Sequence, residues 1–309
     1  MSSVTAAQER SGAPLSVILE QLGLSPATYY RWCERAAAGQ LADRVIVPQR
    51  RVVLPTPTEV GAVCDYALQQ PAMGYKRLTW SMVDQDIAYL RSYQVYRILV
   101  AHDLIVRRPL PLTEALHRPA PAQRPDEVWH IDLMYVYVRP RWYYLVDILD
   151  AYSRYLVHWS LNWTMAAATV TLTVQEAIET VTERRSQEPK IVHDHGSQFV
   201  GHEWRTFVEG AGLGDIMTRV AHPESNGLVE RLHRTHREEG LIGGDATNYA
   251  QALETMRAWG HYYNHARPHS ALGYLYPVDY YRGDPAKRRM ERQAKLAKAA
   301  SERAAYWRA

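Results

Sequence analysis

Residues 128–161 read VWHIDLMYVYVRPRWYYLVDILDAYSRYLVHWSL, and this stretch decides the fold class. The parts at 128–138 and 142–161 are rich in β-branched and aromatic residues, which favour strands, and DAYSR at 150–154 interrupts the second part as a turn. The stretch therefore predicts three consecutive strands. Helical and strand patterns then alternate, with a helix over 166–182, a strand over 190–194 and helices at 206–209 and 224–240. We predict an α/β fold with a mixed sheet and helices on both faces.

Two small helical modules are predicted upstream of this stretch. In residues 14–35, Gly23 marks a turn, and Ser25 followed by Pro26 is a strong start for a second helix. This arrangement is typical of a helix-turn-helix, although any helical hairpin gives the same pattern. The side chains expected on the exposed second helix, as candidates for DNA contact, are Thr28, Tyr29 and Arg31.

The second module is read from GYKRLTWSMVDQDIAYLRSYQVYRILVAHDLI at residues 74–105, where apolar residues recur at helical spacing. Ser92 is the expected cap of its second helix. A helical bundle with solvated charges is the alternative to DNA binding. The basic residues that we propose as DNA contacts here are Lys76, Arg77 and Arg97.

Composition separates the chain into segments of different charge. The 309 residues have a formal net charge of only +3, which by itself does not indicate a polyanionic partner. Residues 1–124 carry 14 Lys+Arg and 10 Asp+Glu, residues 125–283 carry 14 and 20, and residues 284–309 carry 8 and 3. An acidic centre thus lies between two basic arms, a pattern that suits carboxylates binding cations and arms binding a polyanion.

The predicted organisation has five segments. Five prolines without periodic pattern mark a linker and a domain boundary between 109 and 125. The closing segment is rich in Ala, Lys and Arg and predicts a helix that is either solvated and frayed or in contact with DNA or another subunit. The segments are a helix-turn-helix at 1–50, a second one at 56–108, the linker at 109–125, the α/β domain at 126–283 and a basic helix or tail at 284–309.

The cellular setting is also constrained by composition. No run approaches about 18 consecutive apolar residues, and the N-terminus lacks a signal-peptide pattern, so we expect no membrane association. Two cysteines, Cys33 and Cys64, are too few for a disulfide framework and favour a reducing cytoplasm. The 21 Tyr and 9 Trp against 2 Phe fit half-buried core positions or contacts to bases and sugars.

Three carboxylates are the candidate catalytic groups. Asp132 lies within a strand between Ile131 and Leu133, where a carboxylate is costly unless it is paired, hydrogen-bonded or bound to a metal. Asp194 ends a strand, the usual place for a side chain that faces a cleft. Glu230 lies on the helix predicted over 224–240, which follows His222 and Pro223.

That helix is amphipathic in the sequence. At 100° per residue, Glu230 shares one face with basic residues, opposite an apolar face of Leu228, Val229, Leu232 and His236. The pattern fits either a surface stripe with intrahelical ion pairs or a metal ligand beside phosphate-binding side chains. The residues that would contact DNA are His233, Arg234 and Arg237, with Asn226 at the entry to the helix.

The spacing of the carboxylates carries a family resemblance. Between Asp194 and Glu230 there are 35 residues, and between Asp132 and Asp194 there are 61. The chain resembles DDE transposases of the insertion-sequence type with a retroviral-integrase-like core, in which the second Asp and the Glu are commonly 35 residues apart. The motifs that carry the likeness are WHIDLMYV, YYLVDILDAYSRYLVHW, VHDHGSQF, HPESNGLVERLHRT and YNHARPHSALGYLYP, with GYKRL…VYRIL before them.

This resemblance implies an RNase H-like core with a five-stranded mixed sheet, acting on the terminal inverted repeats of an element and on target DNA as at least a dimer. It implies 3′-end cleavage by water followed by attack of the freed 3′-hydroxyl on target DNA. Three carboxylates suit two Mg²⁺ ions, with Mn²⁺ able to substitute, and our hypothesis is that Asp132 bridges the ions while Asp194 and Glu230 hold one each. The paired His and Cys of a retroviral zinc module are absent, and Arg237 stands where the family often has Lys.

Two alternatives and several minor clusters stay open in the sequence. The chain could be an RNase H-like nuclease that cuts without joining, or a domesticated DNA-binding protein without catalysis. His193 and His195 flank Asp194, but strand alternation places them on the opposite face, which disfavours zinc. Asp147 and Asp150 are expected to cap and pair locally near 153–154, and His265 and His269 to pack in a turn.

Overall fold

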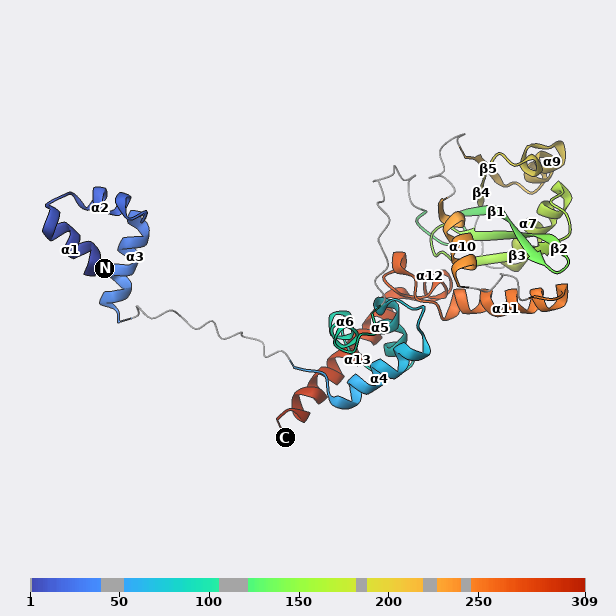
Figure 1. Cartoon of the computed structure of the whole chain (residues 1–309). Helices are drawn as coiled ribbons and strands as arrows, with labels where there is room; N and C mark the ends of the chain where they lie inside the picture. The colour runs from blue at the N-terminus through green and yellow to red at the C-terminus, as the bar shows by residue number, and fades with distance from the viewer. Residues whose placement is uncertain are drawn as a thin grey trace. The chain divides into compact units, whose positions relative to one another are not determined.

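The computed structural model of the chain describes residues 2–39, 53–105, 122–181, 188–218, 227–239 and 246–308. The chain divides into two units, residues 1–52 and 53–309 (Figure 1). Most of the predicted linker at 109–125 and the candidate DNA contact Asn226 lie outside the described residues.

The first unit is a group of three helices: α1 (Ser2–Ser11), α2 (Leu15–Gln21) and α3 (Pro26–Ala37). The predicted start of α3 is confirmed, because the Ser25 hydroxyl accepts a hydrogen bond from the Thr28 amide at 3.2 Å. Val4, Ile18 and Leu19 form the buried centre of the unit. Of the candidate DNA contacts, Arg31 is exposed, whereas Thr28 and Tyr29 are half-buried.

The second helical module has three helices, one more than predicted: α4 (Pro57–Gln69), α5 (Tyr75–Asp84) and α6 (Ser92–Ala101). The start of α4 is fixed by a reciprocal pair, in which the Thr56 amide donates to Glu59 at 2.9 Å and the Glu59 amide donates to the Thr56 hydroxyl at 3.3 Å. The expectation that Ser92 caps α6 was wrong by one position, since Ser92 is the first helical residue. Buried side chains that include Val63, Leu78, Met82, Val95 and Leu99 hold the three helices together.

A five-stranded mixed sheet forms the second part of this unit. Its strands are β1 (Val128–Val138), β2 (Arg141–Asp150), β3 (Leu156–Asn162), β4 (Lys190–His193) and β5 (Gly214–Met217), in the order β3-β2-β1-β4-β5. The first three pair antiparallel, while β4 is parallel to β1 and β5 is parallel to β4. This is the RNase H-like mixed sheet that the sequence analysis expected.

Helices cover both faces of the sheet, and the alternation of each strand divides its side chains between them. One face packs against α7 (Ala167–Val181) and α9 (His202–Gly210) through a cluster that includes Trp129, Ile131 and Ile148. The opposite face packs against α10 (Gly227–Glu238) and α11 (Tyr249–His265) through Met134, Val136 and Leu145. Asp132 is an even-numbered residue of β1, like Met134 and Val136, so it lies on the α10 face.

The aromatic side chains divide between buried and exposed positions. Tyr143, Tyr263 and Trp259 are buried in the cluster under α10 and α11, whereas Tyr135 and Trp142 are exposed. α11 lies close to β3 at Gly260, where an added Cβ would be in van der Waals contact with Trp159 at 3.4 Å.

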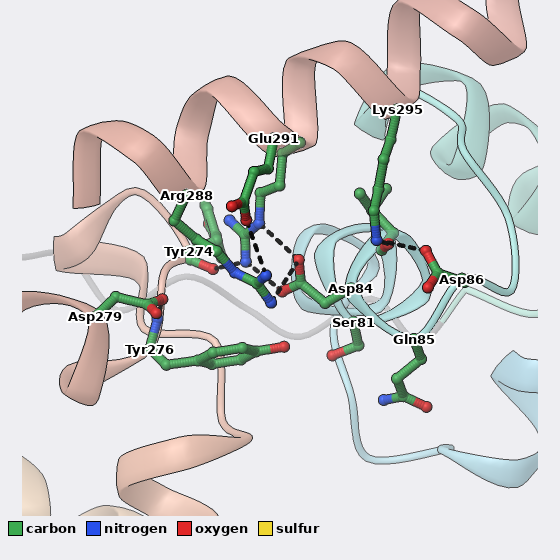
Figure 2. Close-up of polar contacts among 12 residues, drawn as sticks. Ser81, Asp84, Gln85, Asp86, Tyr274, Tyr276, Asp279, Arg288, Glu291 and Lys295 are labelled. Carbon is green, nitrogen blue, oxygen red and sulfur yellow. Dashed lines mark hydrogen bonds and ion pairs between the residues drawn. The ribbon is translucent and has the colours of Figure 1, made fainter. Parts of the chain in front are cut away.

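After the short helices α8 (Ser197–Val200) and α12 (Pro277–Tyr281), the chain ends in the long helix α13 (Pro285–Tyr306). The sequence predicted a helix here, solvated or in contact with DNA or another subunit; instead it packs against α5 of its own chain, as Figure 2 shows for Arg288 and Lys295 facing Asp84 and Asp86. Arg292 contacts both oxygens of Asp84, with its Nε 2.9 Å from one and an Nη 2.5 Å from the other. Several basic residues of the closing segment are thus paired within the chain.

None of the described helices, α13 included, combines the length and apolar character that crossing a membrane requires.

Candidate active site

Asp132 and Asp194 are neighbours across the junction of β1 and β4. The parallel register pairs Val128 with Lys190 and His130 with Val192. Asp132 and Asp194 each lie two residues beyond the last of these pairs, so the same register places them side by side, on strands about 4.8 Å apart. The local pattern that placed each Asp at or inside a strand in the sequence is confirmed.

Each of these carboxylates is partly fixed by its own backbone. One oxygen of Asp132 accepts a hydrogen bond from the Leu133 amide at 2.9 Å. One oxygen of Asp194 accepts from the Gly196 amide at 2.9 Å, in the turn that leads from β4 to α8. Both side chains are half-buried and therefore remain partly open to solvent.

Glu230 is brought to the same place by α10, which packs across β1 and β2. Val229 and Leu232 anchor the helix in the cluster that contains Met134 and Val136 of β1. Glu230 itself is exposed, on the side of α10 that also carries the exposed Arg234 and Arg237. The helix therefore presents one carboxylate and two guanidinium groups to solvent beside the two aspartates.

The electrostatics of Asp132 show that the three carboxylates form one group. Burial, together with the charges of Asp194 and Glu230, raises the pKa of Asp132 to about 6 against the opposing effects of His233 and the Leu133 amide. A like-charge interaction of this kind requires the groups to be close. Asp194 and Glu230 therefore lie near enough to Asp132 for their charges to act on it, and we treat the three residues as the candidate acidic site.

The donor set of this site fits a hard divalent cation. Three carboxylates offer only oxygen ligands, and a bound cation would relieve the repulsion that raises the pKa of Asp132. Within the described ranges, no three His, Cys, Asp or Glu side chains lie close enough together to hold a metal ion in the present arrangement. Mg²⁺ commonly completes its shell with water and substrate phosphate, which is consistent with an open set of this kind.

The sequence analysis placed His233 on the exposed face of α10, and that placement was wrong. The ring is buried, with Nδ1 3.6 Å from an oxygen of Asp132 and Nε2 3.3 Å from an oxygen of Asp147. Burial disfavours the charged ring, but the contacts with Asp147 and Asp132 outweigh it and raise the pKa of His233. A helical wheel counts histidine as polar, so it could not show that His233 faces the sheet and contacts Asp132 and Asp147 there.

The expectation for Asp147 was also wrong, whereas that for Asp150 is confirmed. Asp150 accepts hydrogen bonds from the Ser153 amide at 2.7 Å and the Ser153 hydroxyl at 2.5 Å, as a local cap should. Asp147 instead points to α10, where His236 also lies 3.3 Å from it. Although burial opposes its charge, the two histidines lower the pKa of Asp147 to about 2.

The remaining candidate residues divide between exposed and engaged positions. Lys76 and Arg97 are exposed in the second helical module. Arg77 is half-buried and pairs with Glu239 at 3.1 Å, so it is less available to a phosphate than the sequence suggested. His193 and His195 do not converge on Asp194: His193 contacts Asp215 at 2.7 Å, and His195 contacts the Thr218 carbonyl at 2.5 Å.

Comparison with known families agrees with this arrangement. Two family profiles, both described as integrase core domain, match residues 122–223 and 212–277. The first overlaps Asp132 and Asp194, and the second overlaps Glu230.

Among curated proteins, the chain is 30% identical to the insertion element IS600 uncharacterized 31 kDa protein of Shigella sonnei, over 50% of this chain and 56% of that protein. It is 29% identical to the transposase for insertion sequence element IS904 of Lactococcus lactis, over 52% and 62% of the two chains. It is 27% identical to the putative transposase for IS986/IS6110 of Mycobacterium tuberculosis, over 57% and 64%. The matched region spans less than two thirds of each of these relatives.

Among solved structures, the HTLV-2 integrase catalytic core domain in complex with magnesium aligns with a TM-score of 0.41 and 16% identity, over 51% of this chain and 97% of that one. The catalytic core domain of BIV integrase aligns with a TM-score of 0.39 and 17% identity, over 50% and 93%. The sheet order, rather than these scores, establishes the fold. The integrase core profiles together match residues 122–277, so this part of the chain belongs to the integrase core domain family, and relatives that match the same half of the chain are named transposases.

Proposed function

We propose that this chain catalyses DNA transposition, by freeing the 3′ ends of an insertion element and joining them to target DNA. The observation that carries the proposal is the acidic site, in which the charges of Asp194 and Glu230 act on Asp132 although the three residues come from separate elements. The transposases among its relatives support the same reaction class.

Divalent metal is the cofactor that we propose for this site, as two Mg²⁺ ions for which Mn²⁺ can substitute. Such ions activate an attacking oxygen and relieve the charge of the leaving oxygen in phosphoryl transfer. Asp132, Asp194 and Glu230 would hold them, and the hydrogen bonds from the Leu133 and Gly196 amides would keep the two aspartates oriented. The HTLV-2 integrase core was solved with magnesium, which supports the choice of ion.

DNA contact is proposed for the exposed basic side of α10 and for the helical modules. Arg234 and Arg237 lie beside Glu230, where guanidinium groups would bind phosphates on either side of the reacting bond. The three-helix groups at 2–39 and 53–105 would recognise the terminal inverted repeats. We propose that the protein acts on DNA in the bacterial cytoplasm, at the nucleoid, and as at least a dimer; the HTLV-2 integrase core was solved in dimeric and trimeric forms.

The proposal is tested by joining a duplex, cut from the ends of the element that encodes this chain, to a supercoiled plasmid. Glu230→Gln and Asp132→Asn keep side-chain size but remove a charged ligand, so both variants are expected to bind the duplex and to form no joined product. Glu238→Gln is the matched control, because Glu238 is exposed on the same helix away from the aspartates, and it should join normally.

The outcomes separate the candidate functions. Normal joining by either triad variant contradicts the assignment of the site. A wild-type protein that releases 3′ ends but never joins them is a nuclease, and one that binds the ends without cutting in Mg²⁺ or Mn²⁺ is a DNA-binding protein without catalysis.

A further inference from the structure

Behind the acidic site lies a second polar cluster, formed by Asp147 of β2 with His233 and His236 of α10. Both histidines place Nε2 3.3 Å from the same oxygen of Asp147. Asp147 and His236 are completely buried, and the side chain of His233 is 6% exposed. The cluster is therefore an interior one, and water does not screen its charges.

The geometry inside the cluster is that of ion pairs. Neither oxygen of Asp147 has a hydrogen bond of good angle, and the facing nitrogens of His233 and His236 have none either. The His236 ring also packs on the Trp259 ring of α11, with the centroids 3.5 Å apart. A buried ion pair is a poor source of stability, because desolvating the charges offsets most of their attraction. A contribution to stability therefore does not explain why these three charged groups are buried together.

The cluster reaches the acidic site through one ring. Asp132 and Asp147 are direct partners in the antiparallel register of β1 and β2, and both lie on the α10 face. His233 stands between them, with Nδ1 3.6 Å from Asp132 and Nε2 3.3 Å from Asp147. The oxygen of Asp132 that faces His233 is not the one that accepts from the Leu133 amide, so both oxygens of this carboxylate have a contact.

His233 also relates the position of Glu230 to that of Asp132, because it shares a helix with Glu230 and contacts Asp132. His233 follows Glu230 by three residues on α10, so one helical turn separates them. A ring that is held at Asp147 and touches Asp132 therefore sets how far the helix bearing Glu230 stands from the strand bearing Asp132. A small displacement of such a group costs activity steeply.

We propose that Asp147 is a positioning residue for the acidic site: with His236 beside it, it holds His233 so that the ring fixes the Asp132 carboxylate and the distance to Glu230. This inference rests on the proposed function, because it assigns Asp147 to the service of the same three carboxylates. Replacing a group that orients a metal ligand without itself binding the metal typically lowers metal affinity or activity about 10–100-fold.

Asp147→Asn is the variant that tests the inference, and Asp150→Asn is its matched control. Both aspartates are buried on β2, three residues apart, but Asp150 contacts Ser153 and Asp126 and has no path to Asp132. Each folded variant is titrated with Mn²⁺ in the absence of DNA, using the spectroscopic signal of free Mn²⁺, and is then assayed for joining with kcat and KM measured separately.

We expect Asp147→Asn to weaken Mn²⁺ binding and to lower kcat by about 10-fold or more each, with KM for the DNA duplex unchanged. Asp150→Asn should leave Mn²⁺ affinity and kcat within about twofold of wild type, whatever it does to thermal stability. His233→Gln and the double variant with Asp147→Asn should both resemble Asp147→Asn, because residues that act as one unit are not additive.

Each outcome is decisive. Unchanged Mn²⁺ affinity and kcat in Asp147→Asn overturn the inference, as do equal losses in Asp150→Asn or additive losses in the double variant. If the wild type binds Mn²⁺ but joins no DNA, the proposed function fails, while a selective loss of Mn²⁺ affinity in Asp147→Asn still upholds the positioning role. A wild type that binds no Mn²⁺ overturns both.

Discussion

At the scale of single residues, His269 shows how local surroundings set the response to acid. This histidine is buried after α11, and its ring packs edge-on against Tyr263. Burial, together with the cations of Arg267 and Arg154, lowers the pKa of His269 to about 3. The folded state therefore holds the ring neutral while the unfolded chain does not.

The expected consequence is a loss of stability in acid. Because the folded pKa lies below the unfolded value of about 6.5, the stabilisation is complete above that pH and is lost as the pH falls toward 3. Between pH 6.5 and 5, the free energy of unfolding of wild type should fall by up to about 2 kcal/mol relative to His269→Gln.

Urea unfolding at several pH values measures this difference, and the other titrating groups cancel because both proteins share them. His202→Gln provides the control, since His202 is exposed on α9. Parallel stability curves for wild type and His269→Gln would show that the folded protein accepts a proton at this ring.

At the scale of elements, ion pairs hold α13 against the second helical module. The Arg292 and Asp84 side chains are each 4% exposed, and the guanidinium also donates to the Tyr274 carbonyl at 2.8 Å and lies over the Trp80 ring. Replacing Arg292 by Ala should destabilise the protein by about 3–5 kcal/mol, because it removes the buried partner of Asp84 and leaves this buried charge only the longer contact with Arg288 at 3.6 Å.

Urea unfolding tests this expectation as well, with two companions. Lys298→Ala removes an exposed pair with Glu302 and should change the free energy of unfolding by less than about 1 kcal/mol. Arg292→Met combined with Asp84→Leu should recover most of the loss, since neither charge then remains buried. An Arg292→Ala protein within about 1 kcal/mol of wild type would mean that Asp84 reaches solvent.

Elements of this chain were predictable from sequence where the evidence is local. Strands β1 to β3 follow from runs of β-branched and aromatic residues, and the start of α3 follows from Ser25 and Pro26. The partners of α13 were not predictable, because Arg292 and Asp84 are 208 residues apart and each is ordinary in its own segment. The buried face of α10 was missed for the same reason, since Asp147 lies on another element.

At the scale of the whole molecule, the acidic site was predictable from the family's spacing of Asp132, Asp194 and Glu230. The local pattern around each residue gives no sign that the three lie near one another. The role of the helical modules is less constrained, since a helix-turn-helix pattern also fits a plain helical bundle. Each hydrophobic cluster of the described residues draws its members from one unit alone, with Val4, Ile18 and Leu19 in the first unit and the other clusters in residues 53–309. Removing the first unit therefore takes no side chain from the clusters of the second.

This separation leads to a prediction about which unit reads DNA sequence. A chain that begins at residue 53 should keep the thermal midpoint of the catalytic unit and its response to Mn²⁺, because the three carboxylates and their supporting helices are all retained. Its preference for the element's end duplex over a scrambled duplex should fall at least about tenfold, since base contacts rather than phosphate contacts provide specificity. Arg31→Ala in the full chain should lose part of the same preference, with Arg10→Ala, at another exposed arginine of the first unit, as the charge-matched control for simple loss of a cation. Competition binding at fixed salt measures the ratio, because salt alone changes phosphate-driven affinity. Full discrimination by the shortened chain would assign sequence reading to the module at 53–105 instead, and would leave the first unit with only phosphate or protein contacts to make.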